Sequence, residues 1–141
     1  MTPRITRVAS DGRRITWHCS TCDQPLQPGH GWIELVGDQM RVAYARIRGV
    51  DDIKACQQVN GAISAAAYFD LPGPARWRAT CRVCNGDDAG SGYFIEVAQI
   101  SSLPAFIDWT GHLSDKVWHD QTDWADLCRL VAAAATSRTA A

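Results

Sequence analysis

The sequence predicts a small α+β protein, in which an antiparallel sheet is followed by a C-terminal helical hairpin. Short apolar segments bounded by Gly, Pro and Asp recur up to residue 100, as is typical of strands. From residue 101 onward the apolar residues follow a helical period instead. Two Cys-x-x-Cys pairs, Cys19–Cys22 and Cys81–Cys84, interrupt the strand region and offer four thiolates to one metal ion.

The length and composition suit one domain. The chain has 141 residues, of which 46% are hydrophobic, and it includes six Trp. A chain of this size can bury a hydrophobic core. We therefore expect a single domain, made of a β-rich region over residues 1–100 and a helical hairpin over residues 101–136 that packs on it.

The first predicted strands form a hairpin that leads to the first cysteine pair. Residues 4–9 alternate weakly between apolar and polar side chains, which is typical of an edge strand. Asp11-Gly12 favours a tight turn, and residues 14–17 form the second short strand. This strand ends directly before Cys19.

A second hairpin is predicted after the first cysteine pair. Two Pro and two Gly indicate a loop over residues 23–31, and residues 32–36 read as a strand. Residues 37–39 would form the turn. Apolar and polar side chains alternate over residues 40–47, which we interpret as the returning strand.

The middle of the chain mixes helical and extended signals. Apolar residues at helical spacing, preceded by Asp51 and Asp52, predict a helix over about 51–59. Residues 62–69 either continue this helix or become extended. Residues 70–74 contain two Pro and one Gly and break the chain, and residues 75–80 form a strand into the second cysteine pair.

The strongest strand signal follows the second cysteine pair. Residues 85–92 contain three Gly and two Asp, which predicts a turn. Residues 93–100 are rich in aromatic and β-branched side chains, which favour strands.

Two helices are predicted at the C-terminal end. The first begins after Ser102 as N-cap and runs to about residue 114. The second begins after Asp120 as its cap, with Asp123 three residues later. Its apolar stripe consists of Trp124, Leu127, Cys128, Val131 and Ala135. Residues 136–141 are expected to fray.

The cysteine spacing predicts a metal site. Cys-x-x-Cys places two sulfurs on one face of a tight turn, and two such turns complete a tetrahedron of thiolates. Cys19, Cys22, Cys81 and Cys84 are therefore the predicted ligands of one structural Zn²⁺. Iron and a pair of redox dithiols are the alternatives. His18 and His30 are weaker ligand candidates, and Cys56 and Cys128 read as small buried hydrophobic residues.

On these cysteines and the turns around them, residues 14–36 and 77–100 resemble a zinc ribbon or a related treble-clef module. The resemblance implies a knuckle, a hairpin, a second knuckle and a strand. Because 58 residues separate the pairs, it also implies an inserted hairpin and helix. Together with residues 108–113 and 122–124, the whole pattern is similar to small proteins of actinobacteria and their phages, which would make this chain a regulator or inhibitor of that origin.

The charge distribution favours a binding function. Residues 1–82 contain eleven basic and seven acidic residues, whereas residues 83–141 contain three basic and eight acidic ones. We predict a non-enzymatic adaptor that contacts a protein partner through the acidic helices. The predicted contact residues are Trp109, His112, Asp115, Trp118 and Asp123.

A nucleic-acid contact through the basic half is the alternative function. Arginines interleaved with aromatic side chains can bind phosphates and stack bases. The residues that would do so are Arg14, Arg41, Arg46, Arg48, Arg76, Arg78, Arg82 and Trp77. The same pattern is typical of strands with one solvated face.

Catalysis and secretion are not expected. Asp108 and His112 lie four residues apart and could orient a general base, but helix capping and surface solvation are the favoured explanation of such residues. Strand 93–100 stands where treble-clef nucleases carry a histidine-bearing helix. The N-terminal residues 1–17 contain four Arg and no apolar run, so they predict neither a signal peptide nor a membrane anchor. We therefore expect a cytoplasmic protein whose thiols stay reduced.

Overall fold

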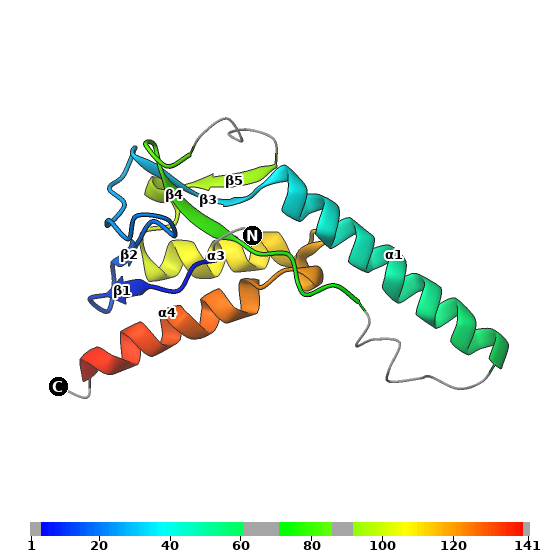
Figure 1. Ribbon diagram of the computed structural model, residues 1–141. Helices are drawn as coiled ribbons and strands as arrows, with labels where there is room; N and C mark the ends of the chain where they lie inside the picture. Colours follow the sequence, from blue (N-terminus) through cyan, green and yellow to red (C-terminus); the bar gives the residue numbers. More distant parts are fainter. Residues whose placement is uncertain (1–3, 61–70, 86–91, 140–141) are drawn as a thin grey trace.

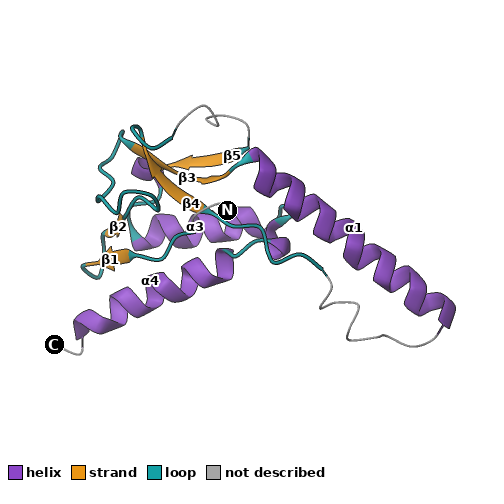
Figure 2. Cartoon of the chain, viewed as in Figure 1, coloured by secondary structure: helices purple, strands orange, loops and turns teal. Residues whose placement is uncertain are grey.

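The computed structural model describes residues 4–60, 71–85 and 92–139. These residues form two small antiparallel sheets and three α-helices, which confirms the predicted α+β class. Figure 1 shows the strands and the two C-terminal helices packed together, while the first helix extends away from them. The strands gather at one end of the molecule, as Figure 2 shows.

The first sheet is the predicted N-terminal hairpin. Strand β1 (Val8–Ser10) pairs antiparallel with β2 (Ile15–Trp17). In the turn between them, Gly12 has a φ of 94°, a left-handed conformation that glycine adopts without steric cost. The Asp11 carboxylate accepts the backbone N–H of Arg14 at 2.7 Å, which closes the turn.

The second sheet has β3 (Gly31–Leu35) at its centre, with β4 (Arg78–Cys81) and β5 (Tyr93–Glu96) on its two sides, both antiparallel. Ile33 is aligned with Ala79 on one side and with Ile95 on the other, and all three are 0% exposed. This row faces the core. Both outer strands are shorter than predicted, and a 3₁₀ turn η2 (Val97–Gln99) follows β5.

The predicted hairpin over residues 37–47 is wrong. Helix α1 (Gly37–Asn60) covers these residues and continues through the predicted helix 51–59. Met40, Ala43 and Ile47 are spaced as one helical face, and all three belong to the core or pack against it. Asp38 lies in the first turn, where the helix dipole favours a carboxylate.

The chain returns from α1 as an extended segment, residues 71–77, which lies along the helix. Leu71 packs so closely on Gly49 that a Cβ there would lie 2.4 Å from its side chain. Farther along, Arg46 donates to the carbonyl of Pro72, and the backbone N–H of Arg76 donates to Gln39 at 2.8 Å. The predictions for residues 62–69, and for most of the turn 85–92, lie outside the described residues.

The predicted helical hairpin is present, with a different start for its second helix. Helix α3 (Leu103–Ser114) begins after Ser102, whose hydroxyl accepts the N–H of Ala105 at 3.2 Å, as predicted. Asp120 does not cap the next helix, because it lies in a 3₁₀ turn, η3 (His119–Gln121). Helix α4 (Trp124–Thr139) begins four residues later, directly after Asp123.

Aromatic side chains from β2, β5, α3, α4 and two connecting segments meet in one core cluster. Its members are Trp17, Trp77, Tyr93, Phe106, Trp118 and Trp124, whose neighbouring ring centroids lie 5.0–6.1 Å apart. Three of the buried indole N–H groups have acceptors: the carbonyl of Ile100, and the hydroxyls of Thr122 and Thr110. The cluster thus joins both sheets to α3 and α4, and the indole N–H groups of Trp17, Trp77 and Trp124 all donate within it.

Among the described residues, no helix combines the length and the apolar character that a membrane crossing requires.

Candidate metal centre

The four predicted cysteine ligands lie together. Their Sγ atoms are all within 4.8 Å of one another, and those of Cys22 and Cys81 are 3.8 Å apart. A tetrahedral ion with ~2.3 Å bonds to sulfur requires sulfurs ~3.8 Å apart. Cys19 is buried, Cys81 and Cys84 are half-buried and Cys22 is exposed, so the cluster lies at the surface. The arrangement can hold a metal ion.

The first cysteine pair is shaped by a turn that continues directly from β2. The N–H of Cys19 donates to Gln24 at 2.9 Å, and the N–H of Asp23 donates back to the carbonyl of Cys19 at 2.9 Å. Asp23 has a φ of 62°, so the chain reverses in the left-handed region. The turn therefore closes within a few residues and places both sulfurs on one side.

Ser20, between the first two cysteines, joins the two halves of the centre. Its N–H donates to the carbonyl of Ala79 at 2.8 Å, and its hydroxyl accepts the N–H of Ala79 at 3.0 Å. The first turn thus occupies the edge of β4 opposite β3, two residues before Cys81. Sequence reasoning missed this contact, because a serine inside a Cys-x-x-Cys pair carries no pairing signal.

The protonation of the thiols also suits a cation. Burial raises the pKa of Cys19, but hydrogen bonds from the backbone of Cys22, Cys81 and Thr21 outweigh it and lower the pKa to about 6. Cys84 has its pKa raised to about 12, chiefly by its hydrogen bond to Cys81 and by burial. One thiolate therefore suppresses the ionisation of its neighbour, and a divalent cation would relieve the repulsion between them.

Neither candidate histidine belongs to the cluster. The Nδ1 of His18 lies 3.1 Å from the backbone carbonyl of Asp23, within the first turn. His30 is exposed in the loop before β3. The four-cysteine group therefore includes neither of the two weaker ligand candidates.

Several predicted nucleic-acid contacts are buried or already engaged. Trp77 is 0% exposed in the aromatic cluster, so it cannot stack a base. Arg78 is enclosed in an ion pair with Glu34, its partner across β3 and β4, at 2.6 Å. Arg41 pairs with Asp38, and Arg46 donates to Gln121 at 3.2 Å. The Arg46 contact is partly buried, whereas the Arg41–Asp38 pair is exposed on α1.

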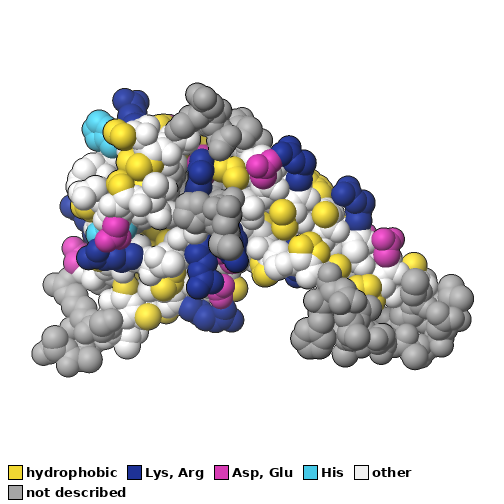
Figure 3. Space-filling view, viewed as in Figure 1, with side chains coloured by type: hydrophobic (Ala, Val, Ile, Leu, Met, Phe, Trp, Pro, Cys, Tyr) yellow, Lys and Arg dark blue, Asp and Glu magenta, His cyan; other side chains and the backbone are white. Residues whose placement is uncertain are grey.

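The remaining predicted arginines lie on separate elements. Arg14 is at the β1–β2 turn, Arg48 on α1, Arg76 on the return segment and Arg82 between the second pair of cysteines. Figure 1 places the β1–β2 hairpin and the outer part of α1 at opposite ends of the molecule. On the face drawn in Figure 3, Lys and Arg side chains stand in separate places, several beside acidic ones.

The predicted partner contacts divide into exposed and buried residues. His112 and Asp115 are exposed on and after α3, and Trp109 is half-buried, with its ring 5.2 Å from that of His112. Trp118 belongs to the aromatic cluster. Asp123 is buried, and its carboxylate accepts the backbone N–H of Trp77 at 2.9 Å. Both residues are buried, so neither offers its side chain to a protein partner on the surface of α3, and these two predicted contacts are wrong.

Comparisons of the chain with protein-family models, with curated proteins and with solved structures find no match. The resemblance to small actinobacterial and phage proteins thus gains no support from them. The candidate function depends on the geometry alone.

Proposed function

We propose that this chain is a non-enzymatic binding protein that holds one structural zinc ion and contacts a protein partner through α3. The cluster of four thiols from two separate turns carries the proposal. Tetrahedral thiolate sets are typical of structural zinc sites, which leave no open position for a reactant. Four thiolates give a zinc centre a formal charge of about −2. The exposed guanidinium of Arg82, next to Cys81, partly offsets it.

Metal analysis of the purified chain tests the zinc site. We expect about one zinc per chain, and its loss in Cys81→Ala, because three thiolates bind a structural zinc far more weakly than four. Cys128→Ala is the matched control, since Cys128 is half-buried in α4 and outside the cluster. Iron in place of zinc, or equal zinc in both variants, would contradict the assignment.

The partner surface that we propose is the outer side of α3. It surrounds an open hollow of about 600 Å³, and we define this α3 surface by Ile107, Asp108, Trp109, Gly111, His112 and Asp115. Ile107 is 62% exposed beside two carboxylates. Within the described part of the chain, no Lys or Arg lines the hollow. Such a surface suits a partner with a basic residue next to an apolar side chain.

Charge reversal on α3 tests this surface. Asp108→Lys/Asp115→Lys should abolish the retention of proteins from host lysate that the wild-type chain retains. The matched control is Asp51→Lys/Asp52→Lys, which makes the same charge change at exposed positions of α1. If both double variants lose the same partners, net charge rather than α3 determines binding. If neither loses any, the α3 surface is not the contact.

A further inference from the structure

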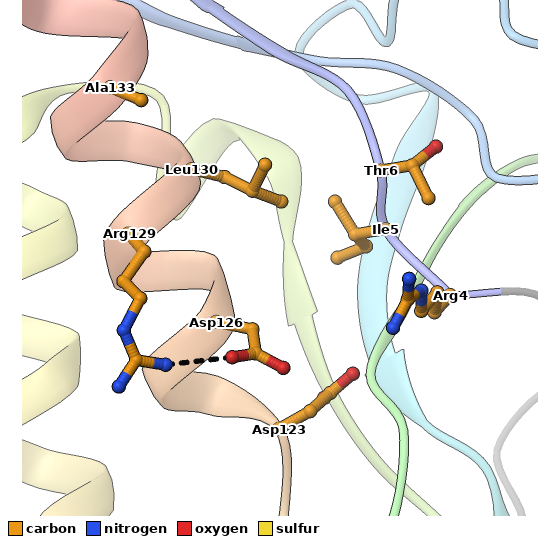
Figure 4. A pocket seen from close by; sticks show the side chains of 8 residues that line it. All are labelled: Arg4, Ile5, Thr6, Asp123, Asp126, Arg129, Leu130 and Ala133. Atoms are coloured by element: carbon orange, nitrogen blue, oxygen red, sulfur yellow. Dashed lines mark hydrogen bonds and ion pairs between the residues drawn. The ribbon is translucent and has the colours of Figure 1, made fainter.

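A second cavity, away from the cysteines, lies between α4 and the segment that precedes β1. Its volume is about 560 Å³, which is within the range of small-molecule sites. Residues 4–6 form one wall and the first turns of α4 form the other (Figure 4). None of its lining residues belongs to the four-cysteine cluster or to the α3 surface.

The cavity has an apolar middle. The side chains of Ile5 and Leu130 face each other across it, and Ala133 continues the α4 wall. Ile5 is buried and belongs to the hydrophobic core, so this wall is fixed by packing. A ligand in the cavity would place an apolar group against these side chains.

The charged groups of the cavity differ in their partners. Arg129 donates to Asp126 at 2.8 Å, so these two charges offset each other. Asp123 is only 9% exposed, and its Oδ1 accepts the N–H of Trp77. Among the residues that the structure describes, neither Asp123 nor Arg4 takes part in an ion pair. Burial raises the pKa of Asp123, and the positive charge of Arg76 partly offsets that rise without forming an ion pair with it among the described residues. The Asp123 carboxylate and the Arg4 guanidinium can therefore still pair with groups of a ligand.

Asp123 and Arg4 are directed into the same space. Figure 4 shows the Asp123 side chain pointing from the start of α4 toward the segment that carries Arg4. Burial raises the pKa of Asp123, which means that its charged form lacks solvation. A cationic group of a ligand would stabilise the charged carboxylate of Asp123. An anionic group would form a charge-assisted hydrogen bond with the guanidinium of Arg4.

From this arrangement we infer that the cavity binds a small zwitterion of the amino-acid class, with an apolar side chain. The ammonium group binds Asp123, the carboxylate binds Arg4, and the side chain packs between Ile5 and Leu130. The site is independent of the metal centre, so it adds a ligand-binding function to the proposed protein contact.

Titration of the full chain with leucine and with glycyl-leucine tests this site, because the two differ in the separation of their charges. The backbone amide resonance of Trp77 is the reporter, since its N–H is bound to Asp123. We expect saturable shifts with at least one of the two zwitterions at millimolar concentration. 3-Methylbutylamine and 4-methylpentanoate, which carry one charge each, should bind at least about tenfold more weakly.

Three variants complete the test. Asp123→Asn keeps an oxygen for the Trp77 N–H but removes the charge, and Arg4→Gln changes an exposed residue without affecting the core. Each should weaken zwitterion binding about tenfold or more, while the exposed control Arg14→Gln leaves it unchanged. The inference is overturned if neither zwitterion binds. It is also overturned if the amine or the acid binds as tightly as the zwitterions. A third contradicting result is unchanged zwitterion binding in Arg4→Gln, a variant whose interpretation does not depend on whether Asp123→Asn folds.

Discussion

Ser20 shows how a single residue determines the position of the thiols. It offers both a donor and an acceptor to Ala79, so the first cysteine turn is aligned with the strand that leads to Cys81. Thr21, the other residue inside the same pair, is exposed and makes no comparable contact through its side chain among the described residues. The two positions therefore form a natural comparison.

Ser20→Ala should lower the free energy of unfolding by about 1–3 kcal/mol, because the N–H of Ala79 loses its acceptor. It should also weaken metal binding, since the two turns are no longer held in register. Urea unfolding and competition with a chromophoric zinc chelator measure the two effects. Thr21→Ala should change neither; equal effects of the two variants would show that Ser20 does not align the turns.

Metal uptake should release protons and should weaken as the pH falls. Its hydrogen bond with Cys81, followed by burial and contact with the other thiols, raises the pKa of Cys84 to about 12, so this group enters the site protonated at neutral pH. Cys19, with a pKa of about 6, is already mostly ionised at pH 7 and becomes protonated below pH 6. Lowering the pH from 7 to 5 therefore adds a further proton that the metal must displace.

Calorimetric titrations with zinc in buffers of different ionisation enthalpy measure this proton release. The number of protons released should rise by nearly one between pH 7 and pH 5, in step with the fall in affinity. A proton count that is constant over this range would contradict the assignment of a thiolate to Cys19.

Residue-level reasoning predicted the cysteine cluster but not the role of its neighbours. The spacing of Cys-x-x-Cys determines where two sulfurs can lie, whatever the rest of the fold. An alternating strand pattern, in contrast, does not say which face is covered. Trp77 and Arg78 looked like an aromatic and a basic surface residue, yet Trp77 faces the core and Glu34 encloses Arg78.

Helix α1 shows where element-level reasoning failed. The alternation of residues 40–47 suggested a strand, but the segment is rich in Ala, Arg and Met, which favour helices. Its buried side consists of Met40, Ala43 and Ile47, which have helical spacing. Val42 and Tyr44 are also apolar, and together with Met40 they produce the alternation that is typical of a strand. What determined the result is packing against η3 and the return segment, which no local pattern reveals. The C-terminal helices were predicted more closely because their apolar period and the Ser102 cap agree.

Gly92, directly before β5, lies against the backbone at the end of β3. A Cβ on Gly92 would lie 2.0 Å from the carbonyl oxygen of Leu35, which is backbone and cannot move aside cheaply. Gly92→Ala should therefore destabilise the fold by about 2–4 kcal/mol. At Gly73 a Cβ meets nothing within 4 Å, so Gly73→Ala is the matched control and should be nearly neutral. If the two variants have the same midpoint of thermal unfolding, the backbone of Leu35 does not limit the size of the side chain at position 92.

At the scale of the whole molecule, two separate centres hold the fold together. The cysteine cluster joins the end of the β1–β2 hairpin to β4, and the aromatic cluster joins both sheets to α3 and α4. Trp17, two positions before Cys19, is the nearest link between them along the chain. Loss of one centre should thus leave much of the other intact.

Chelation of the metal should lower the midpoint of thermal unfolding while the far-ultraviolet circular dichroism at low temperature keeps its helical signal. Hydrogen exchange should accelerate at Cys19, Ser20 and Ala79, and much less at Trp77, whose N–H is held by Asp123. Zinc should restore the original values. Uniform loss of protection over the chain would show instead that the aromatic cluster cannot persist without the metal.

Cys22 and Cys81 are 59 positions apart, and all of α1 and its return segment lie between them. In polymer terms, a metal ion that joins them closes a loop whose entropic cost grows only with the logarithm of its length, so doubling the loop costs about 0.6 kcal/mol. The outer turns of α1, beyond its contact with Leu71, can therefore lengthen or shorten at little cost to folding. This leaves the reach of the helix free to vary in evolution while the metal centre and the core stay the same.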